Sequence, residues 1–578
     1  MYFSNKNNYF HIIKDFIIII LFILYIYKKK IYLLIKRQHF LINAFIDKVK
    51  EKLFHKKNSF QNYLEANKIK WSKINNSNSN SSNKILVSNF VGHSAFTMTE
   101  CLIGKYLSIF STSDIVGLLS KRDQTGKKIF KSFNIKKFYI YEETNLLKKI
   151  KLLTKSINIL KSINSIEQFI NLEIDKIHFG KIVYDHYIRY TGIPSENKIK
   201  LKFYFFLADA LFINELCKNI FKIEKISILV ASEIQFIPAA VIFQNALKHN
   251  ATVYARDGGP TTFSIRKFAD SSEIYTNFCK YPKSLIDLVS KNKYNLAVEK
   301  GDEIIRKRFS NQPLDNDIRD AEIAFSKTSK TYTKKQLCDL FNWDYSKPIA
   351  CIFAANLLDG NYLNGDKLFQ DNLTWFRATL NEIKNTTNIN WIIKEHPTYI
   401  SAGQKAKISS VDEYYRICGN EKHICLLPKE ISGSSLKNLI SLAVTSLGSV
   451  GIEYPSLGIP CLRAADSHYG DFDFSINPKT QEEYFSYLCE INKIPKLSVE
   501  QINEAKIFTF VQFAFTKFKH PLLPNYSITR LGKKAQEKFW HESKHLIQNY
   551  NIKNDKFMKM FKYQYINNNR HLINLDIL

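Results

Sequence analysis

The chain has 578 residues, of which 45% are hydrophobic and 24% are charged, and its formal net charge is +30. The apolar fraction excludes general disorder, and the low counts of glycine (19) and proline (14) exclude collagen-like and low-complexity chains. Nine cysteines stand singly without a C-x-x-C pair, which favours a reducing compartment over a zinc ribbon or a disulfide framework.

Residues 1–74 are predicted to form a basic arm that contains an apolar helix. Phe16–Tyr27 is an unbroken apolar run, and Lys28–Lys30 follow it directly. A helix of that run is only ~18 Å long, against ~30 Å for the hydrocarbon core of a bilayer. The positive charge favours an anionic membrane surface as a partner and places the rest of the chain on the cytoplasmic face of the inner membrane. We expect the helix to anchor in the membrane or to lie on it; a helix buried in the globular body is the alternative.

The basic charge is concentrated near the start of the chain. Residues 1–84 hold 16 Lys or Arg and four Asp or Glu, so about +12 of the +30 lies there. Elsewhere the lysine excess accompanies heavy use of Ile, Asn, Tyr and Phe, which codon bias in an AT-rich genome would also produce. Because no zinc finger, basic recognition helix or RNA-binding motif accompanies the charge, we predict no nucleic-acid partner.

Short apolar strands alternate with helices in two series. An Asn/Ser linker at 75–84 precedes the first series, which with a helical connection forms an N-terminal α/β domain at 85–345. The second series forms a C-terminal α/β domain at 346–500, and 501–578 adds C-terminal helices and a basic tail. This alternation predicts parallel sheets with helices on both faces, and hence two doubly wound, Rossmann-like domains that face a cleft.

The first candidate site motif follows a predicted strand in the second series. The apolar residues 391–393 lead into Lys394, Glu395, His396 and Pro397. A lysine and a histidine beside a proline-restricted turn can present two donors to a phosphate group.

The second motif follows a strand that ends at Ser446. Its Gly448-Ser449 turn opens a predicted helix that carries Glu453. Free N–H groups and the helix dipole favour an anion at such a turn, and Glu453 is placed to accept hydrogen bonds from ribose hydroxyls. A Gly-Ser turn that merely caps a helix is the alternative.

These motifs carry a family resemblance. K-E-H-P followed by S-V-G-I-E-Y-x-x-L-G-I-P resembles the capsule polysaccharide biosynthesis proteins, which include Kdo-type transferases and related HP-motif sialyltransferase-like enzymes. The segments 177–189, 352–360 and 471–484 agree with it, and the match runs discontinuously from about residue 85 to residue 488. The resemblance implies a GT-B-like fold, two Rossmann-like domains of which the C-terminal one binds the nucleotide-sugar.

The resemblance also implies residue roles in the C-terminal domain. His396 with Lys394 would contact the donor phosphate, Ser449 would support it, and Glu453 would hold the ribose. The chain departs from the pattern at Gly448, where relatives usually carry serine, so one hydroxyl contact is missing or is replaced by a backbone N–H.

Glycosyl transfer also needs a base that deprotonates the acceptor hydroxyl, and in this architecture the N-terminal domain supplies it. Asp257, in a Gly-rich turn after a strand, is the first candidate, and a carboxylate that only shapes the turn is the alternative. His93, on the loop after the first strand, is the second, with a helix-entry histidine as the alternative. Glu233 and Asp185 rank third.

No metal and no cofactor are expected. Asp471-Phe472-Asp473 imitates the Asp-x-Asp metal site of another transferase fold, but it follows the nucleotide motif rather than an early strand. GT-B enzymes generally use basic residues and helix ends in place of a metal, and the nucleotide-sugar is a substrate.

Together these features predict a glycosyltransferase of capsular or lipopolysaccharide-type surface polysaccharide. It would transfer a sugar from a nucleotide-sugar, CMP-linked donors among the candidates, to a saccharide or lipid-linked acceptor. Two alternatives stay open: a CDP-glycerol-type polyol-phosphate transferase, and a non-catalytic, membrane-tethered partner in polysaccharide assembly or export.

Overall fold

The computed structural model describes residues 15–28, 58–74, 82–142, 146–275, 280–310, 330–362, 367–397, 406–428, 431, 433–525 and 533–577. The chain divides into two compact units. Unit 1 comprises Met1–His186, Asn197–Ser271 and Lys519–His571, and unit 2 comprises Tyr187–Glu196, Ser272–Phe518 and Leu572–Leu578. The division that the sequence suggested at residue 345 falls inside unit 2.

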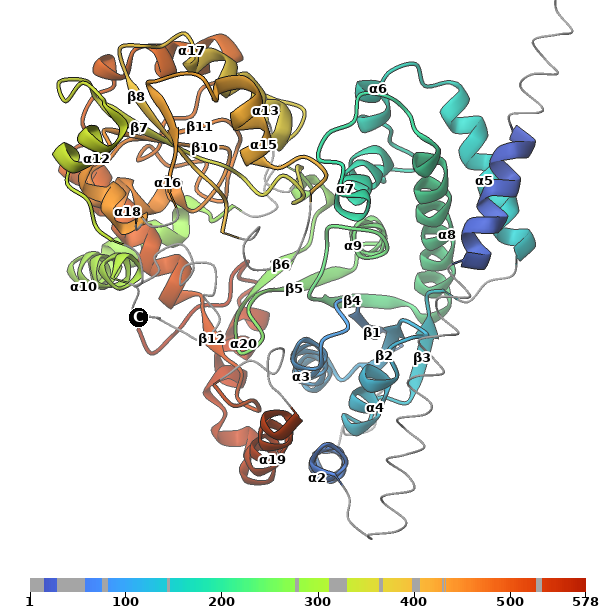
Figure 1. Cartoon of the computed structure of the whole chain (residues 1–578). Coiled ribbons are helices and arrows are strands. Elements are labelled where there is room, and N and C mark those ends of the chain that lie inside the picture. Colours follow the sequence, from blue (N-terminus) through green and yellow to red (C-terminus); the bar gives the residue numbers. More distant parts are fainter. Residues whose placement is uncertain are drawn as a thin grey trace, which may run out of the picture. The chain divides into compact units, whose positions relative to one another are not determined.

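Unit 1 is built on a seven-stranded sheet in the order β12-β6-β5-β4-β1-β2-β3 (Figure 1). The strands are β1 (Lys84–Asn89), β2 (Asp114–Leu119), β3 (Lys137–Ile140), β4 (Ile226–Ala231), β5 (Thr252–Gly258), β6 (Thr262–Phe268) and β12 (Phe518–Lys519). The strands β1 to β5 pair in parallel, and β6 runs antiparallel to β5.

Helices follow the strands of unit 1 in the predicted alternation. They are α2 (Ser59–Lys73), α3 (Ser94–Ser111), α4 (Gln124–Ser132), α5 (Leu146–Lys161), α6 (Ile166–Ile170), α7 (Phe179–Thr191), α8 (Leu201–Glu224), α9 (Ala239–Lys248), α19 (Lys533–Asn549) and α20 (Lys556–Ile566). Close packing of α3 on β1 requires a glycine, because a Cβ atom at Gly104 would lie 2.5 Å from Cγ2 of Val87.

The predicted apolar segment is helical over residues 15–28, which we call the apolar helix. Its Ile18, Phe22 and Ile26 are buried with residues of α5 and α8, and the Phe22 and Phe205 rings lie 5.1 Å apart. One side of the helix therefore belongs to the body of unit 1, as the buried alternative predicted. In the described part of the chain, no helix combines enough length with enough apolar character to cross a bilayer.

Unit 2 contains a five-stranded, all-parallel sheet in the order β11-β10-β7-β8-β9. Its strands are β7 (Ile349–Phe353), β8 (Asn390–Lys394), β9 (Ile424–Leu426), β10 (Leu442–Thr445) and β11 (Cys461–Arg463). The chain starts in the middle at β7, adds β8 and β9 on one side, and then crosses to β10 and β11 on the other. The strand order therefore reverses between β7 and β10, where doubly wound sheets bind their ligands.

Both faces of this sheet are covered, as the apolar strand patterns predicted. One buried cluster joins the sheet to α13 (Asn372–Ile383), α15 (Ser410–Cys418) and α17 (Gln481–Cys489). Another joins it to α12 (Lys334–Phe341) and the end of α10 (Lys283–Phe309).

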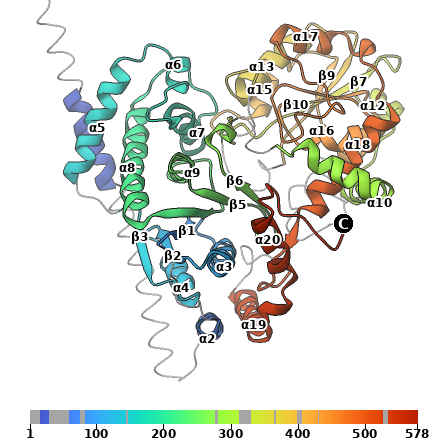
Figure 2. The same ribbon diagram turned by 180° about the vertical axis from the view of Figure 1, so that it is seen from behind.

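The helices α10 and α18 (Val499–Phe510) lie side by side in unit 2 (Figure 1, Figure 2). Their contact is very close, because a Cβ atom at Gly301 would lie 2.0 Å from the carbonyl oxygen of Lys506. The Lys506 ammonium also pairs with Asp302 at 2.9 Å. The close contact fixes the second half of α10, after the non-helical residue Lys293, against α18.

Candidate functional site

The two predicted motifs of unit 2 lie at the same edge of the sheet. Lys394 pairs with Phe353, Phe353 pairs with Thr445, and Thr445 pairs with Arg463, so these residues form one row across the carboxyl ends of four strands. Neighbouring strands are about 4.8 Å apart, so β8 and β10 end about 10 Å from each other with β7 between them. This spacing matches the size of a phosphate group with its ligands.

Lys394 lies at the end of β8 and is partly buried. Its Nζ atom lies 5.9 Å from the centroid of the Phe353 ring. Burial lowers the pKa of Lys394, and the nearby Cys351 and Glu453 act in the opposite direction. The structure therefore holds an amine at this strand end in surroundings where an anionic ligand would stabilise its charged form.

His396 and Pro397 follow Lys394 directly, and both are partly buried. They lie at the same carboxyl edge as the end of β8, because the strand stops at Lys394. Residues 398–405, which continue this loop, lie outside the described residues.

The second motif follows β10 and is held by hydrogen bonds within the protein. The Ser446 hydroxyl donates to Oδ1 of Asn372 at 3.2 Å. The Gly448 N–H donates to Oγ1 of Thr445 at 3.3 Å, and the Gly448 carbonyl accepts from the Tyr469 hydroxyl at 2.6 Å. The Gly448 N–H, which the sequence offered as a substitute for the missing hydroxyl, therefore has an internal partner.

The helix predicted after this turn is present and carries Glu453, but it is short. α16 covers only Val450–Glu453, and a 3-10 turn at Pro455–Leu457 continues it. Ser449 stands at its N-cap but makes no side-chain cap; its hydroxyl donates to Oε1 of Glu453 at 3.0 Å. A four-residue helix has a small dipole, so the predicted dipole contribution to anion binding is weak.

Glu453 forms a buried ion pair that the sequence did not reveal. The Nη2 atom of Arg308, on α10, lies 2.5 Å from Oε1 of Glu453. The Arg308 guanidinium also stacks over the Phe513 ring at 4.6 Å. One carboxylate oxygen of Glu453, Oε1, thus accepts hydrogen bonds from both Arg308 and Ser449. The only sequence signal for Arg308 is a basic cluster, residues 306–308, at the end of a helix.

Arg463, at the end of β11, and Tyr469, in the loop that follows, support the β10 turn. Nη2 of the buried Arg463 donates to the carbonyl of Gly470 at 2.8 Å, and its guanidinium lies 5.6 Å from the centroid of the Tyr469 ring. A Cβ atom at Gly451 would lie 2.0 Å from the Tyr469 hydroxyl. The glycine of the S-V-G motif is thus required by this tyrosine.

The predicted bases belong to unit 1. Asp257 lies near the end of β5 with a 63% exposed side chain, and its carboxylate is 3.8 Å from Nη2 of Arg266 on the adjacent β6. His93 is the N-cap of α3, and its Nδ1 accepts from the Ala95 N–H at 3.2 Å. This is the geometry expected of a histidine that only caps the start of the helix.

The third-rank candidates differ from each other. Glu233 is the second residue after β4, and its Oε1 accepts from the backbone N–H groups of Ile234 and Gln235 at 2.9 and 2.8 Å. Asp185 is buried on α7.

The sequence missed several polar residues at the carboxyl edge of the unit 1 sheet. Nδ2 of Asn89, the last residue of β1, donates to Asp123 at 2.5 Å. Oε1 of Glu100 accepts from the Ser232 N–H at 3.1 Å, directly after β4. Burial raises the pKa of Glu100 to about 8. No motif marks these residues, since their proximity arises from the pairing of β1 with β2 and β4.

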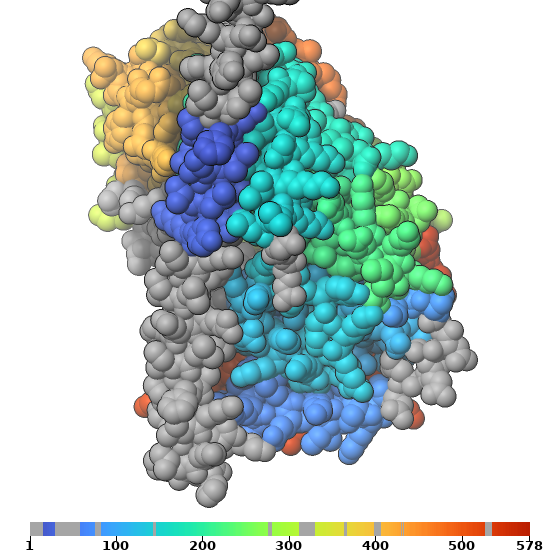
Figure 3. Space-filling model, turned by 90° about the vertical axis from the view of Figure 1, so that its right-hand side faces the viewer, coloured from blue at the N-terminus to red at the C-terminus, as the bar shows by residue number. Residues whose placement is uncertain are grey.

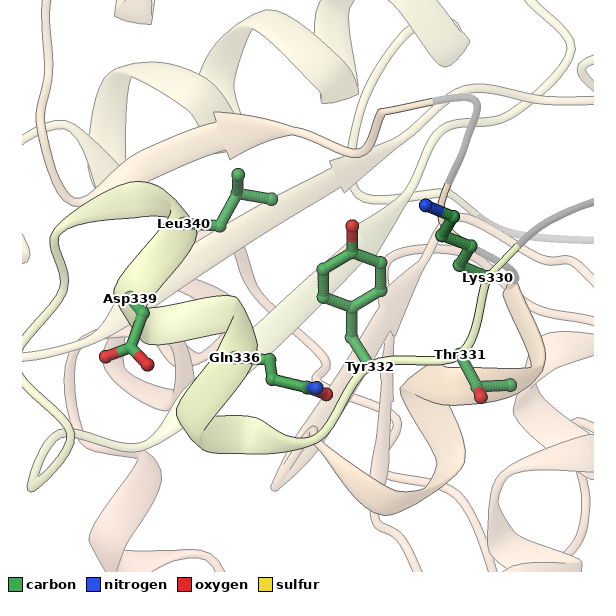
Figure 4. Close-up of a pocket in the computed structure, with 6 residues that line it drawn as sticks. All are labelled: Lys330, Thr331, Tyr332, Gln336, Asp339 and Leu340. Carbon is green, nitrogen blue, oxygen red and sulfur yellow. The ribbon is translucent and has the colours of Figure 1, made fainter.

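A pocket of about 570 Å³ opens at the start of α12. It is lined by Lys330, Thr331, Tyr332, Gln336, Asp339 and Leu340, and Figure 4 shows these side chains along one helix and the segment before it. None of the predicted site residues lines this pocket, and the candidate site is defined by the motifs that follow β8 and β10.

The described residues contain no group of three or more His, Cys, Asp or Glu side chains placed to hold a metal ion. In the Asp-x-Asp segment, Asp471 pairs with Lys280 at 2.9 Å. Metal independence stays a prediction.

No protein-family model and no curated protein matches the chain. Solved structures to which it is similar include Thermosulfurimonas dismutans KpsC β-Kdo 2,4 transferase, at 10% identity and a TM-score of 0.29 over 56% of this chain and 87% of that chain. S. aureus MnaA bound to UDP shows 9% identity and a TM-score of 0.25 over 74% of this chain and 91% of that chain. Anabaena HepE with UDP and glucose shows 10% identity and a TM-score of 0.23 over 75% of this chain and 95% of that chain. Kdo transferases, which the sequence motifs resemble, are thus among the structures similar to this chain.

Proposed function

We propose that the protein is a GT-B-type glycosyltransferase that binds a nucleotide-sugar at the carboxyl edge of the unit 2 sheet. The observation that carries the proposal is the shared edge of Lys394 and the 446–449 turn, on either side of β7. A departing nucleotide carries negative charge on its phosphate, and preorganised cations and hydrogen-bond donors stabilise that charge. Lys394 and His396 are the donors that the sequence places there.

The residue roles follow from this placement. Lys394 would pair with the phosphate, which favours its ammonium form. Glu453 would accept the ribose hydroxyls through Oε2, since Oε1 is engaged by Arg308 and Ser449. Arg308 would thus act as a positioning residue for Glu453.

On the acceptor side we propose Asp257 as the general base. Its side chain is exposed, as a base that meets an acceptor hydroxyl must be, and its carboxylate lies 3.8 Å from Nη2 of Arg266. His93 is the weaker candidate because its Nδ1 caps α3.

The acceptor would be a saccharide or a lipid-linked saccharide of a surface polysaccharide. A lipid-linked acceptor places the reaction at the cytoplasmic face of the inner membrane, in agreement with the basic N-terminal arm. No cofactor and no metal is required, because basic residues would stabilise the leaving group.

A specific observation favours a second candidate, a non-catalytic assembly or export partner of the same fold. Two groups that the motif offers to a ligand, the Gly448 N–H and Oε1 of Glu453, are satisfied within the protein. This role predicts that nucleotide binding is weak and that no product forms.

Titration of the purified full chain with CMP-, UDP- and GDP-sugars tests the proposal. We expect one nucleotide class to bind and Lys394→Met to weaken it, while Lys493→Met, at a 74% exposed side chain of the same unit, leaves it unchanged. Folded protein that binds none of these donors would contradict the proposal. Product mass separates sugar transfer from polyol-phosphate transfer, and binding without product supports the non-catalytic role.

A further inference from the structure

The apolar helix (residues 15–28) has two apolar sides with different surroundings. Ile18, Phe22 and Ile26 are at most 6% exposed, since they pack on unit 1. The opposite side remains 39–63% exposed and consists of Phe16, Ile17, Ile20, Leu21, Leu24 and Tyr27. We call these six residues the outer stripe. They recur every three or four positions, so they form one continuous face of the helix.

The outer stripe lies on the surface of unit 1. Figure 3 shows the apolar helix in dark blue at the surface, next to side chains of unit 1. Asp15, at the start of the helix, pairs with Lys161 at the end of α5 at 2.5 Å, so the helix is held by an ion pair as well as by its buried side. A contiguous exposed apolar face of this kind marks an interaction surface.

Positive charge lies at the end of the stripe and on the neighbouring helix α5. Lys28 closes the helix and is exposed, and Lys29 and Lys30 follow it in the sequence. α5, which packs against the helix, carries five lysines and no acidic residue, and its Lys151 and Lys155 are exposed. An apolar face bordered by lysines is complementary to acyl chains beneath anionic headgroups.

We propose that the outer stripe docks the protein on an anionic lipid bilayer, with the apolar helix parallel to the membrane surface and still packed on unit 1. A second copy of the chain fits the surface less well, because it carries the same positive charge at Lys28 and on α5. A spanning orientation would require Ile18, Phe22 and Ile26 to leave their packing partners. A parallel helix keeps that packing and inserts only the stripe, about 5–10 Å deep.

The inference deepens the proposed membrane location, and it rests on the helix rather than on the nucleotide site. Nucleotide binding is therefore measured on the same samples. If the full chain binds nucleotide but not lipid, only this inference is overturned. If it binds lipid but not nucleotide, only the proposed reaction is overturned.

Co-sedimentation of the full chain with vesicles tests the docking. We expect binding to phosphatidylcholine vesicles with 30% phosphatidylglycerol, weaker binding in high salt, and little binding to phosphatidylcholine alone. The double variant Ile20→Ser/Leu24→Ser should lose affinity by at least about tenfold, since two inserted apolar side chains are removed. The control Leu340→Ser replaces a 52% exposed leucine of unit 2 and should bind as the parent does. Both variants alter exposed residues, and equal thermal unfolding confirms that they fold.

Depth measurements test the orientation. The tryptophans of the variants Ile17→Trp and Leu24→Trp should be quenched equally by shallow brominated lipids, after subtraction of the parent signal, when the helix lies flat. Unequal depths would show a tilted or inserted helix and overturn the parallel geometry. An Ile20→Ser/Leu24→Ser variant that binds vesicles like the parent, or that instead loses a dimer seen in light scattering, would overturn lipid docking.

Discussion

Arg308 on α10 and Glu453 on α16 form an ion pair at 2.5 Å, although 145 positions separate them in the chain. Both residues are at least nine-tenths buried. A buried ion pair stabilises little by itself, but removing one partner leaves an uncompensated charge.

Arg308→Met should therefore destabilise unit 2 by about 3 kcal/mol, measured by urea unfolding. The double variant Arg308→Met/Glu453→Gln should lose less stability than the two single variants together, because it leaves no isolated charge. Strict additivity would show that the pair is energetically unimportant.

The pH dependence of nucleotide binding should report on Lys394. Burial lowers the pKa of Lys394 below the ordinary value of 10.5, so its ammonium loses the proton at lower pH than an exposed lysine. Phosphate binds the ammonium form, and affinity should fall as pH rises through that lowered pKa. Arginine stays charged in this range, so Lys394→Arg should remove the decline in isothermal titrations. If the affinity of Lys394→Arg falls with pH as that of the parent does, another titrating group causes the decline.

Glu100 should make unit 1 less stable as pH rises. Burial raises its pKa to about 8 from 4.5, so between these values the unfolded chain loses the proton first and the folded state is disfavoured. The loss amounts to about 4 kcal/mol across the window. Glu100→Gln keeps a neutral side chain, and its unfolding free energy should fall less between pH 5 and pH 8. Parallel pH profiles of the two proteins would contradict the raised pKa.

Asp257 and His93 are distinguished by conservative substitutions. Asp257→Asn should lower kcat by about 10²–10⁴-fold with little change in donor KM if the carboxylate is the base. Asparagine is a good N-cap, so His93→Asn should keep stability and activity if the histidine only caps α3. If instead His93→Asn lowers kcat and Asp257→Asn does not, His93 is the base.

Arg256 should position the turn that carries Asp257. Its Nη1 donates to the Gly258 carbonyl at 2.9 Å, Nη2 donates to the Gly259 carbonyl, and the guanidinium lies 3.9 Å from the Phe96 ring centroid. Lysine cannot reach both carbonyls, so Arg256→Lys should reduce kcat about tenfold or more while donor KM stays near the parent value. A tenfold rise in donor KM with an unchanged kcat would instead show that Arg256 acts in donor binding.

The sequence predicted the strands of unit 2 well because each is a short, nearly continuous apolar run, as buried parallel strands are. It placed Lys394 and Ser446 correctly at strand ends, since a strand end is a local property. It missed Arg308 because only tertiary packing brings α10 to Glu453. It also did not divide the apolar helix into two sides, because a run without polar residues carries no periodicity to mark which side faces the protein.

The close contact between Gly301 and α18 has a mechanical consequence. Seven residues separate Gly301 from Arg308, about 10 Å along a straight helix. Any side chain larger than hydrogen at position 301 would push α10 away from α18. The C-terminal end of α10 would move with it, and the Arg308 guanidinium would leave Glu453. A substitution at position 301 would thus break the Arg308–Glu453 ion pair without altering either of its members.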